Sequence, residues 1–370
     1  MRCYASELSS FLQNDKTQVN AYGVPVLTKA IPDDARPGRI DPRELEILQD
    51  RAAQSIASEV RQAEPSIQEI RDQMGFPNLN MNTVEIYTRY EEHTFEGNRV
   101  AIWIYYPRKP AGKKGRAGFI YLHGGGWMGG TPFTVENPCK LLVERADCVV
   151  FNIDYSLAPE KPYPNGLDDC FNAVKHIYAN AEQYQIDRQK IGIGGDSAGG
   201  NLAAVCALRD RDMATHMLNY QALIYPAVTF VSDGVPGYRW QIEDYEMDPE
   251  QRELIDPMLS IGRPVEHEGS LGVERLYLQH GEDLRDPSVS PLLSSSFADL
   301  CRTLIVTAEF DGLRIQGEVY GKKLLDAGVD VRAVRYRGVF HAFFDKLGVL
   351  PQAEDLVQEI ANDILGLFNS

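Results

Sequence analysis

The pentapeptide Gly195–Gly199 carries the clearest chemical pattern in this sequence. It reads Gly-Asp-Ser-Ala-Gly, directly after a predicted apolar strand (KIGIG) and at the start of a helical segment. A serine on a sharp strand-to-helix turn needs small neighbours, because larger side chains would clash in that strained geometry. The turn exposes the hydroxyl at the sheet edge, and the helix N-terminus favours negative charge that develops there. The pattern indicates that Ser197 is a nucleophile.

Two other interpretations of this glycine-rich turn have to be weighed. A glycine turn with a helix-capping serine occurs in many proteins, so the pentapeptide alone does not settle the role of Ser197. A dinucleotide-binding loop requires the spacing G-x-G-x-x-G. Gly192 and Gly194 fit that spacing, but its third position is Ser197, and no strand with a terminal acid follows at the required distance. The sequence therefore disfavours a nucleotide cofactor.

A second glycine-rich segment, His123–Trp127, ends a predicted apolar strand (GFIYLH). Its three consecutive glycines let backbone N–H groups point freely into a site, as an oxyanion hole requires. An ordinary flexible loop is the alternative, but ending a buried strand in that way is entropically costly without a purpose. Taken together, the two glycine-rich segments favour chemistry that runs through an activated serine.

The elements around these segments alternate between short apolar strands and helices. This alternation predicts the α/β class, with a mainly parallel sheet of about eight strands and helices on both faces. Residues 83–227 and 286–370 are predicted to form the catalytic domain. Residues 1–82 look helical and polar, and residues 228–285 form an acidic, aromatic insertion. A structureless loop of that length is uncommon, so we expect both extra segments to form a lid over the carboxyl edge of the sheet.

The bulk composition limits the partners of this chain. A formal net charge of −16 disfavours nucleic acid, because phosphate binding uses clustered Lys and Arg. The six cysteines are scattered without paired spacing, and the first residues hold no apolar signal sequence, so we expect free thiols and a cytoplasmic protein. No stretch has the length of a membrane span. No motif for a metal or another cofactor is present, so we predict none.

Five motifs, in their order along the chain, resemble those of the hormone-sensitive lipase family of α/β-hydrolase esterases. They read HGGGW, DYSLAPEKPYP, GDSAGG, EFDGLR and FHAFF, and the similarity extends over about residues 84–227 and 286–346. The resemblance implies an α/β-hydrolase fold with a helical lid and no cofactor. It also implies hydrolysis of small-molecule esters with short- to medium-chain acyl groups, and a homodimer as one option.

The resemblance also assigns the site residues by position. It implies Ser197 as the nucleophile, Asp311 as the acid and His341 as the base. It places the oxyanion hole at the backbone amides of Gly125, Gly126 and Ala198. We further expect three residues to shape the site, namely His123, Trp127 and Asp196.

The order of the predicted strands supports the assignment of the acid and the base. Asp311 and His341 each follow a strand, so both are expected at the carboxyl edge of the sheet where Ser197 lies. Glu309 is a rival acid, but it still lies within its strand, and the geometry of a triad favours Asp311. A surface histidine between aromatic residues is the alternative interpretation of His341.

Several alternatives stay open from the sequence. An amidase or peptidase would share the same triad, and a non-enzymatic ligand receptor can use the same scaffold, although the presence of His341 argues against a receptor. The aromatic residues Trp127 and Tyr245 either line the substrate pocket or pack within the lid. The other histidines, including His93 and His176, lack a catalytic context and are expected to be structural.

Overall fold

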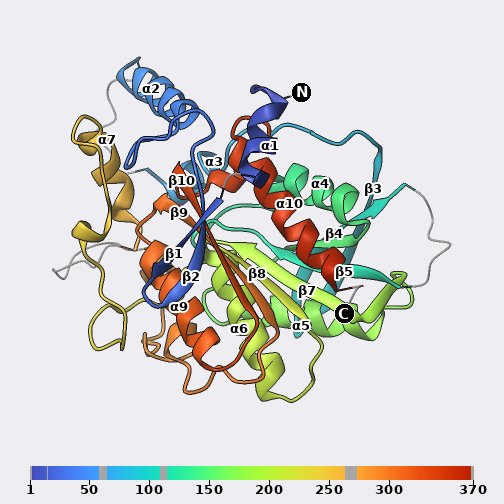
Figure 1. The fold of residues 1–370 in the computed structure, drawn as a ribbon. Helices are drawn as coiled ribbons and strands as arrows, with labels where there is room; N and C mark the ends of the chain where they lie inside the picture. Colours follow the sequence, from blue (N-terminus) through green and yellow to red (C-terminus); the bar gives the residue numbers. More distant parts are fainter. Residues whose placement is uncertain (1, 15, 58–64, 109–114, 263–272, 368–370) are drawn as a thin grey trace.

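The computed structural model describes residues 2–14, 16–57, 65–108, 115–262 and 273–367. These residues form one ten-stranded sheet with helices on both faces (Figure 1). The strands are β1 (Lys16–Ala21), β2 (Val24–Lys29), β3 (Ile86–Phe95), β4 (Asn98–Pro107), β5 (Arg116–Leu122), β6 (Val149–Asp154), β7 (Ile186–Asp196), β8 (Tyr220–Ile224), β9 (Arg302–Phe310) and β10 (Val331–Phe340). The helices are α1 (Ser6–Asn14), α2 (Pro42–Ala57), α3 (Ile67–Asp72), α4 (Glu136–Ala146), α5 (Asn165–Ala179), α6 (Ala198–Asp212), α7 (Arg252–Ile255), α8 (Val273–Tyr277), α9 (Arg314–Asp326) and α10 (Pro351–Gly366).

The centre of the sheet is parallel, as the alternation of strands and helices predicts. The strand order is β1-β2-β10-β9-β8-β7-β5-β6-β4-β3. The strands from β10 to β6 in this order pair in parallel, whereas β4 and β3 continue the sheet in antiparallel pairs. Because the central strands are parallel, their carboxyl ends meet at one edge, and the loops that follow them lie side by side.

Both faces of the central sheet are buried, and β5 shows how its sequence achieves this. Phe119 and Tyr121 point into the core that contains α4 and α10, whereas Ile120 and Leu122 point into the core that contains α5, α6 and α9. Successive side chains of a strand point to opposite faces, so a strand between two helical layers is apolar along its whole length. This explains the apolar run that precedes the glycine-rich segment His123–Trp127.

The N-terminal segment corrects one expectation. The prediction that residues 1–82 are only helical is wrong for residues 16–29, which form the β1–β2 hairpin and bring the sheet to ten strands rather than about eight. Almost all of β1 is exposed, so it lacks the apolar run that marks the other strands. Tyr22 and Gly23 turn the hairpin with φ of 51° and 86°, and β2 then pairs in parallel with β10. The expected helical character does hold for α2, which begins at Pro42.

The N-terminal segment and the insertion between β8 and β9 contact each other. The Asp248 amide donates to the Gly38 carbonyl over 2.8 Å, and the Ile40 amide donates to the Gln251 side chain over 2.7 Å. In Figure 1, α2 and α7 lie on the same side of the molecule. No helix in the described part of the chain is long and apolar enough to cross a bilayer.

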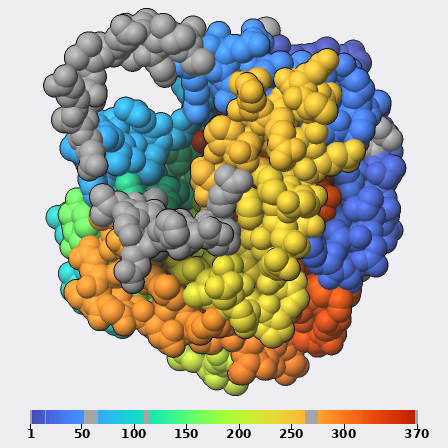
Figure 2. Space-filling model, turned by 90° about the vertical axis from the view of Figure 1, so that its left-hand side faces the viewer, coloured from blue at the N-terminus to red at the C-terminus, as the bar shows by residue number. Residues whose placement is uncertain are grey.

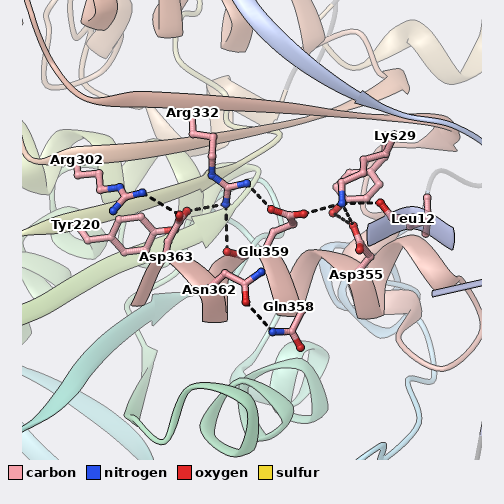
Figure 3. Close-up of polar contacts among 11 residues, drawn as sticks. Leu12, Lys29, Tyr220, Arg302, Arg332, Asp355, Gln358, Glu359, Asn362 and Asp363 are labelled. Carbon is pink, nitrogen blue, oxygen red and sulfur yellow. Dashed lines mark hydrogen bonds and ion pairs between the residues drawn. The ribbon is translucent and has the colours of Figure 1, made fainter. Parts of the chain in front are cut away.

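A buried ion-pair network attaches the hairpin to α10 (Figure 3). Lys29, at the end of β2, is fully buried, and its Nζ lies 2.8 Å from Asp355 Oδ2 and 2.6 Å from Glu359 Oε1. The same ammonium donates to the Leu12 carbonyl of α1 over 2.8 Å. Arg332 of β10 pairs with Glu359 from the other side. One side chain therefore joins α1, the hairpin and the C-terminal helix.

We expect Lys29→Met to lower the free energy of unfolding by about 3–5 kcal/mol, because it leaves the buried Asp355 carboxylate without its counter-ion. Chemical denaturation of the purified protein measures this change. The matched control is Lys322→Met, which removes a surface pair with Asp326 four residues away and is expected to cost about 0.5 kcal/mol or less. Equal losses in the two variants would contradict the assigned role of Lys29.

Candidate active site

Ser197 lies on a sharp turn between β7 and α6. Its φ of 55° and ψ of −117° lie outside the regions that side-chain-bearing residues normally occupy. The flanking glycines make room for the turn, because a Cβ at Gly195 would lie 2.4 Å from the Leu122 carbonyl oxygen and one at Gly199 only 2.0 Å from it. The predicted strand–turn–helix context of the pentapeptide is thus the one observed.

The structure brings Ser197, His341 and Asp311 into one hydrogen-bonded series. His341 Nε2 lies 2.8 Å from Ser197 Oγ, and His341 Nδ1 lies 2.7 Å from Asp311 Oδ2. Asp311 directly follows β9 and His341 directly follows β10, so both residues lie at the same sheet edge as the serine. Asp311 is fully buried, and its Oδ1 accepts from the Leu313 amide over 2.9 Å, which orients the carboxylate.

The environment of His341 sets its proton affinity. Burial alone would lower the pKa of His341, but the charge of Asp311 and its hydrogen bond outweigh burial and leave the pKa raised above the ordinary 6.5. The carboxylate also accepts the Nδ1 proton and thereby keeps Nε2 free to accept the proton of Ser197 Oγ. The arrangement can activate a serine hydroxyl and stabilise the imidazolium that results.

A glycine loop lies beside the serine. Gly125 and Gly126 have positive φ values of 125° and 60°, and a Cβ at Gly125 would lie 2.2 Å from the Gly129 carbonyl oxygen. In the described part of the chain, neither amide donates a hydrogen bond to another protein group. The amide of Ala198 opens α6, where first-turn N–H groups have no acceptor within the helix. These three N–H groups are available to an oxyanion.

Asp196 holds the glycine loop against the turn that carries Ser197. Its Oδ1 accepts from the Gly124 amide and from the Tyr121 hydroxyl, each over 2.9 Å. Burial raises the pKa of Asp196, although these two hydrogen bonds act in the opposite direction. The residue before the serine therefore positions the loop that carries the free amides.

We expect Asp196→Ala to lower kcat by about 10²–10³, comparable to the loss of one oxyanion donor, because the Gly124 amide loses its acceptor and the loop shifts. Asp196→Asn keeps an acceptor oxygen in the same place and is expected to stay within about tenfold of the wild type. Steady-state kinetics on one activated ester compares the two variants. A kcat unchanged in the alanine variant would rule out this positioning role.

The other two residues expected to shape the site lie on either side of the glycine loop. The His123 ring is fully buried, its Nδ1 lies 2.9 Å from the Gly124 carbonyl oxygen, and burial lowers its pKa to about 4. A neutral ring hydrogen-bonded to a backbone carbonyl fits a structural role. Trp127 stacks on Tyr277 of the insertion with ring centroids 4.9 Å apart, so it joins the glycine loop to the insertion.

Two further residues bear on alternatives that the sequence left open. The Glu309 carboxylate accepts from the Gly338 amide over 2.7 Å and pairs with Arg337, and none of its recorded contacts in the described chain is to His341. The Tyr245 hydroxyl donates to the Asp311 carbonyl over 2.9 Å and is buried. Tyr245 thus packs behind Asp311, which supports packing within the insertion rather than pocket lining.

Arg71 supports the glycine loop, a role that the sequence analysis did not predict. From α3 its guanidinium donates to the Met128 carbonyl over 2.6 Å and to the Ala158 carbonyl over 2.9 Å, and it pairs with Glu160. It ties an N-terminal helix to the end of the glycine loop. An arginine in a short polar helix gives no sequence signal for such a role, since both acceptors are backbone carbonyls.

A small cavity of about 140 Å³ borders His341. Its other walls include Leu48 and Arg51 of α2, Phe76 and Met258, which come from the two extra segments. Figure 2 shows the side of the molecule that carries these segments, where the surface is hollowed between the light-blue N-terminal residues and the yellow insertion. A larger open cleft of about 530 Å³, which includes Arg71 among its lining residues, contains no member of the triad.

A parallel sheet that presents a Ser-His-Asp series beside a glycine loop defines a serine hydrolase of the α/β-hydrolase type. Comparison with known proteins agrees. A family model described as alpha/beta hydrolase fold matches residues 119–345. An arylesterase of Saccharolobus solfataricus is 33% identical over 282 residues, which cover 75% of this chain and 83% of that protein. Carboxylesterase NlhH of Mycobacterium tuberculosis is 31% identical over 274 residues, covering 72% and 79%.

A solved structure extends the similarity to three dimensions. EstE1, a thermophilic carboxylesterase cloned from a metagenomic library, superposes with a TM-score of 0.67 at 30% identity, covering 82% of this chain and 98% of that one. The chain belongs to the α/β-hydrolase fold family, and within it to the hormone-sensitive lipase type.

Proposed function

We propose that this chain hydrolyses short- to medium-chain acyl esters through a covalent acyl-enzyme on Ser197. The broader class is established, since similarity to arylesterase and carboxylesterase over most of the chain makes it a serine carboxylic ester hydrolase. The finer proposal rests above all on one observation, the 2.8 Å and 2.7 Å contacts that join Ser197, His341 and Asp311.

The proposed reaction follows from these contacts. His341 Nε2 accepts the Ser197 proton as Oγ attacks the ester carbonyl, and Asp311 stabilises the imidazolium. The carbonyl oxygen becomes an oxyanion that accepts hydrogen bonds from the amides of Gly126 and Ala198, with Gly125 beside them. His341 then donates its proton to the leaving alcohol. Water, activated by the same imidazole, releases the acid from Ser197.

The two extra segments support a lid over the site. The part of residues 1–82 that follows the β1–β2 hairpin, together with residues 228–285, is proposed to cover the site, because α2 and Met258 wall the cavity beside His341 and the segments bond to each other through Asp248. The cavity beside His341 is lined by neither Ser197 nor the glycine loop, so the acyl length is proposed from the family motifs instead. These motifs resemble those of esterases for short- to medium-chain acyl groups, and we expect turnover to fall as the acyl chain lengthens.

A series of p-nitrophenyl esters, from acetyl to long-chain acyl, tests this proposal. We expect kcat/KM to be highest for short and medium chains and at least about tenfold lower for long chains, since one misfit methylene already costs 10- to 200-fold in a hydrophobic pocket. A matched p-nitroanilide measures amide hydrolysis and is expected to react far more slowly. Faster cleavage of the anilide, or no cleavage of any ester, would contradict the proposal.

A further inference from the structure

Glu91, His93 and His176 form a side-chain cluster that the esterase mechanism does not use. Glu91 and His93 are two residues apart on β3 and so share one face of that strand, and His176 meets them from α5. β3 is the last strand of the sheet, and β4, β6 and β5 separate it from β7, which leads to the nucleophile. The cluster is therefore distinct from the active site.

The three side chains converge through atoms that commonly bind metals. Each offers one donor atom, and all three donors lie within 4.8 Å of one another. His93 Nε2 lies 3.0 Å from Glu91 Oε2, and the two imidazole rings have centroids 4.1 Å apart. Tetrahedral zinc with bonds of about 2.0–2.1 Å holds its donors about 3.3 Å apart. The donors therefore have to approach one another by at most about 1.5 Å on binding.

Neighbouring groups support the three donors from outside. The Tyr184 hydroxyl donates to Glu91 Oε2 over 2.8 Å and lies 3.0 Å from His176 Nε2. Arg89 pairs with Glu91 Oε1 and leaves Oε2 directed at the histidines. Metal-binding carboxylates are characteristically held by such outer hydrogen bonds. The Glu91 and His93 side chains are only 11% and 23% exposed, so the donors are partly withdrawn from water.

We propose that Glu91, His93 and His176 bind one divalent transition-metal ion, with Zn²⁺ as the best fit, and that this ion joins the edge strand β3 to α5. Two imidazoles and one carboxylate suit zinc, copper or nickel, whereas Mg²⁺ and Ca²⁺ prefer all-oxygen sets. Three protein ligands leave a fourth position for water. On binding, Tyr184 keeps its hydrogen bond to Glu91 and releases His176 Nε2 to the ion.

The role of this ion is stability rather than chemistry. Hydrolysis by a Ser-His-Asp series uses no metal, and the Glu91–His93–His176 cluster lies at the β3 edge of the sheet, with β4, β6 and β5 between it and β7. An ion that binds only the folded chain stabilises it by mass action. We expect saturating Zn²⁺ to raise the unfolding temperature by about 2–5 °C without a change in kcat.

Calorimetric titration of the chelator-treated full chain with ZnCl₂ tests this site. We expect one ion per chain, with a dissociation constant on the order of 1 μM or below. X-ray absorption of the loaded wild type is expected to show two imidazole ligands, a readout that requires no variant. Ester hydrolysis is measured in the zinc-loaded protein as well. Unchanged hydrolysis would show that the ion does not bind at His341, where it would block the base.

Variants identify the ligands. Each of the variants His93→Gln and His176→Gln removes one metal-donor atom. Loss of a residue that only hydrogen-bonds to a metal ligand already weakens metal binding by about 10–100-fold, so we expect each variant to weaken zinc binding by more than that. The matched control is His280→Gln at an exposed histidine, which is expected to bind as the wild type does. Absence of zinc uptake, uptake undiminished in both ligand variants, or an equal loss in His280→Gln would overturn the proposal.

Discussion

Ser197→Ala is expected to lower kcat for an activated acetyl ester by about 10⁴–10⁶, since it removes the atom that forms the acyl-enzyme. The hydroxyl lies 2.8 Å from His341 Nε2, and no other group in the described site can replace it in that position. What remains is hydrolysis assisted by binding and by the glycine-loop amides alone. The variant is expected to keep its fold, because the strained turn depends on Gly195 and Gly199 rather than on the hydroxyl.

Two measurements make this expectation specific. Steady-state kinetics gives kcat, and mass spectrometry after treatment with a phosphonate ester shows whether a single covalent adduct forms on the wild type and none on the variant. Ser10→Ala, at an exposed position of α1, is the matched control and is expected to behave as the wild type. A variant at Ser197 that keeps more than about 1% of the activity would refute the nucleophile assignment.

Asp311→Asn is expected to lower kcat by about 10⁴ while leaving the protein folded. The Asp311 carboxylate accepts the Nδ1 proton of His341 over 2.7 Å. An asparagine amide of the same shape can donate to Nδ1 instead, which places the proton on Nε2 and removes the base from the serine. The loss thus follows from the wrong tautomer rather than from lost packing.

The pH dependence of kcat/KM gives a second readout of the same pair. His341 acts as a base only when neutral, so activity is expected to rise with pH through an apparent pKa above the ordinary 6.5, because Asp311 raises the pKa of His341. Replacing the carboxylate with a neutral amide removes that effect and leaves burial, which lowers the pKa. The residual activity of Asp311→Asn is therefore expected to rise at a lower pH than that of the wild type.

Glu309→Gln is the matched control for the acid. Glu309 is also largely buried, and it precedes Asp311 by two residues, but its carboxylate accepts from the Gly338 amide, which a glutamine oxygen can replace. We expect kcat within about tenfold of the wild type and an unchanged pH profile, because a conservative swap keeps the hydrogen bond. A loss of kcat as large as that of Asp311→Asn would indicate that Glu309, rather than Asp311, is the acid of the triad.

The resemblance of the motifs to a known family predicted the fold and the residues that meet at the site. It could do so because each motif is a short, local segment of the chain. Ser197 depends on glycines within two residues of it, and Asp311 and His341 each lie directly after a strand. Parallel strands end at a common edge, so local positions along the chain already imply convergence. The mainly parallel sheet follows from the same short-range alternation.

The hairpin and its anchor could not be predicted in that way. β1 is exposed almost throughout, so it has no apolar periodicity, and β2 pairs with β10 about 300 residues further along the chain. Lys29 looks like any surface lysine in the sequence, yet it is fully buried against Asp355 and Glu359. A charged side chain is buried only where oppositely charged partners surround it. Here those partners are remote in sequence, so no local pattern predicts the burial of Lys29.

Local sequence was thus enough to predict the fold class, the turn at Ser197 and the glycine loop, since these depend on backbone geometry set by a few adjacent residues. The small cavity beside His341, the contacts of Arg71 and the approach of His176 to Glu91 and His93 became visible in the folded chain alone. No metal motif spans the 83 residues from His93 to His176. Their approach is set by packing of α5 against an edge strand, and such long-range contacts are chosen by the whole core rather than by any one segment.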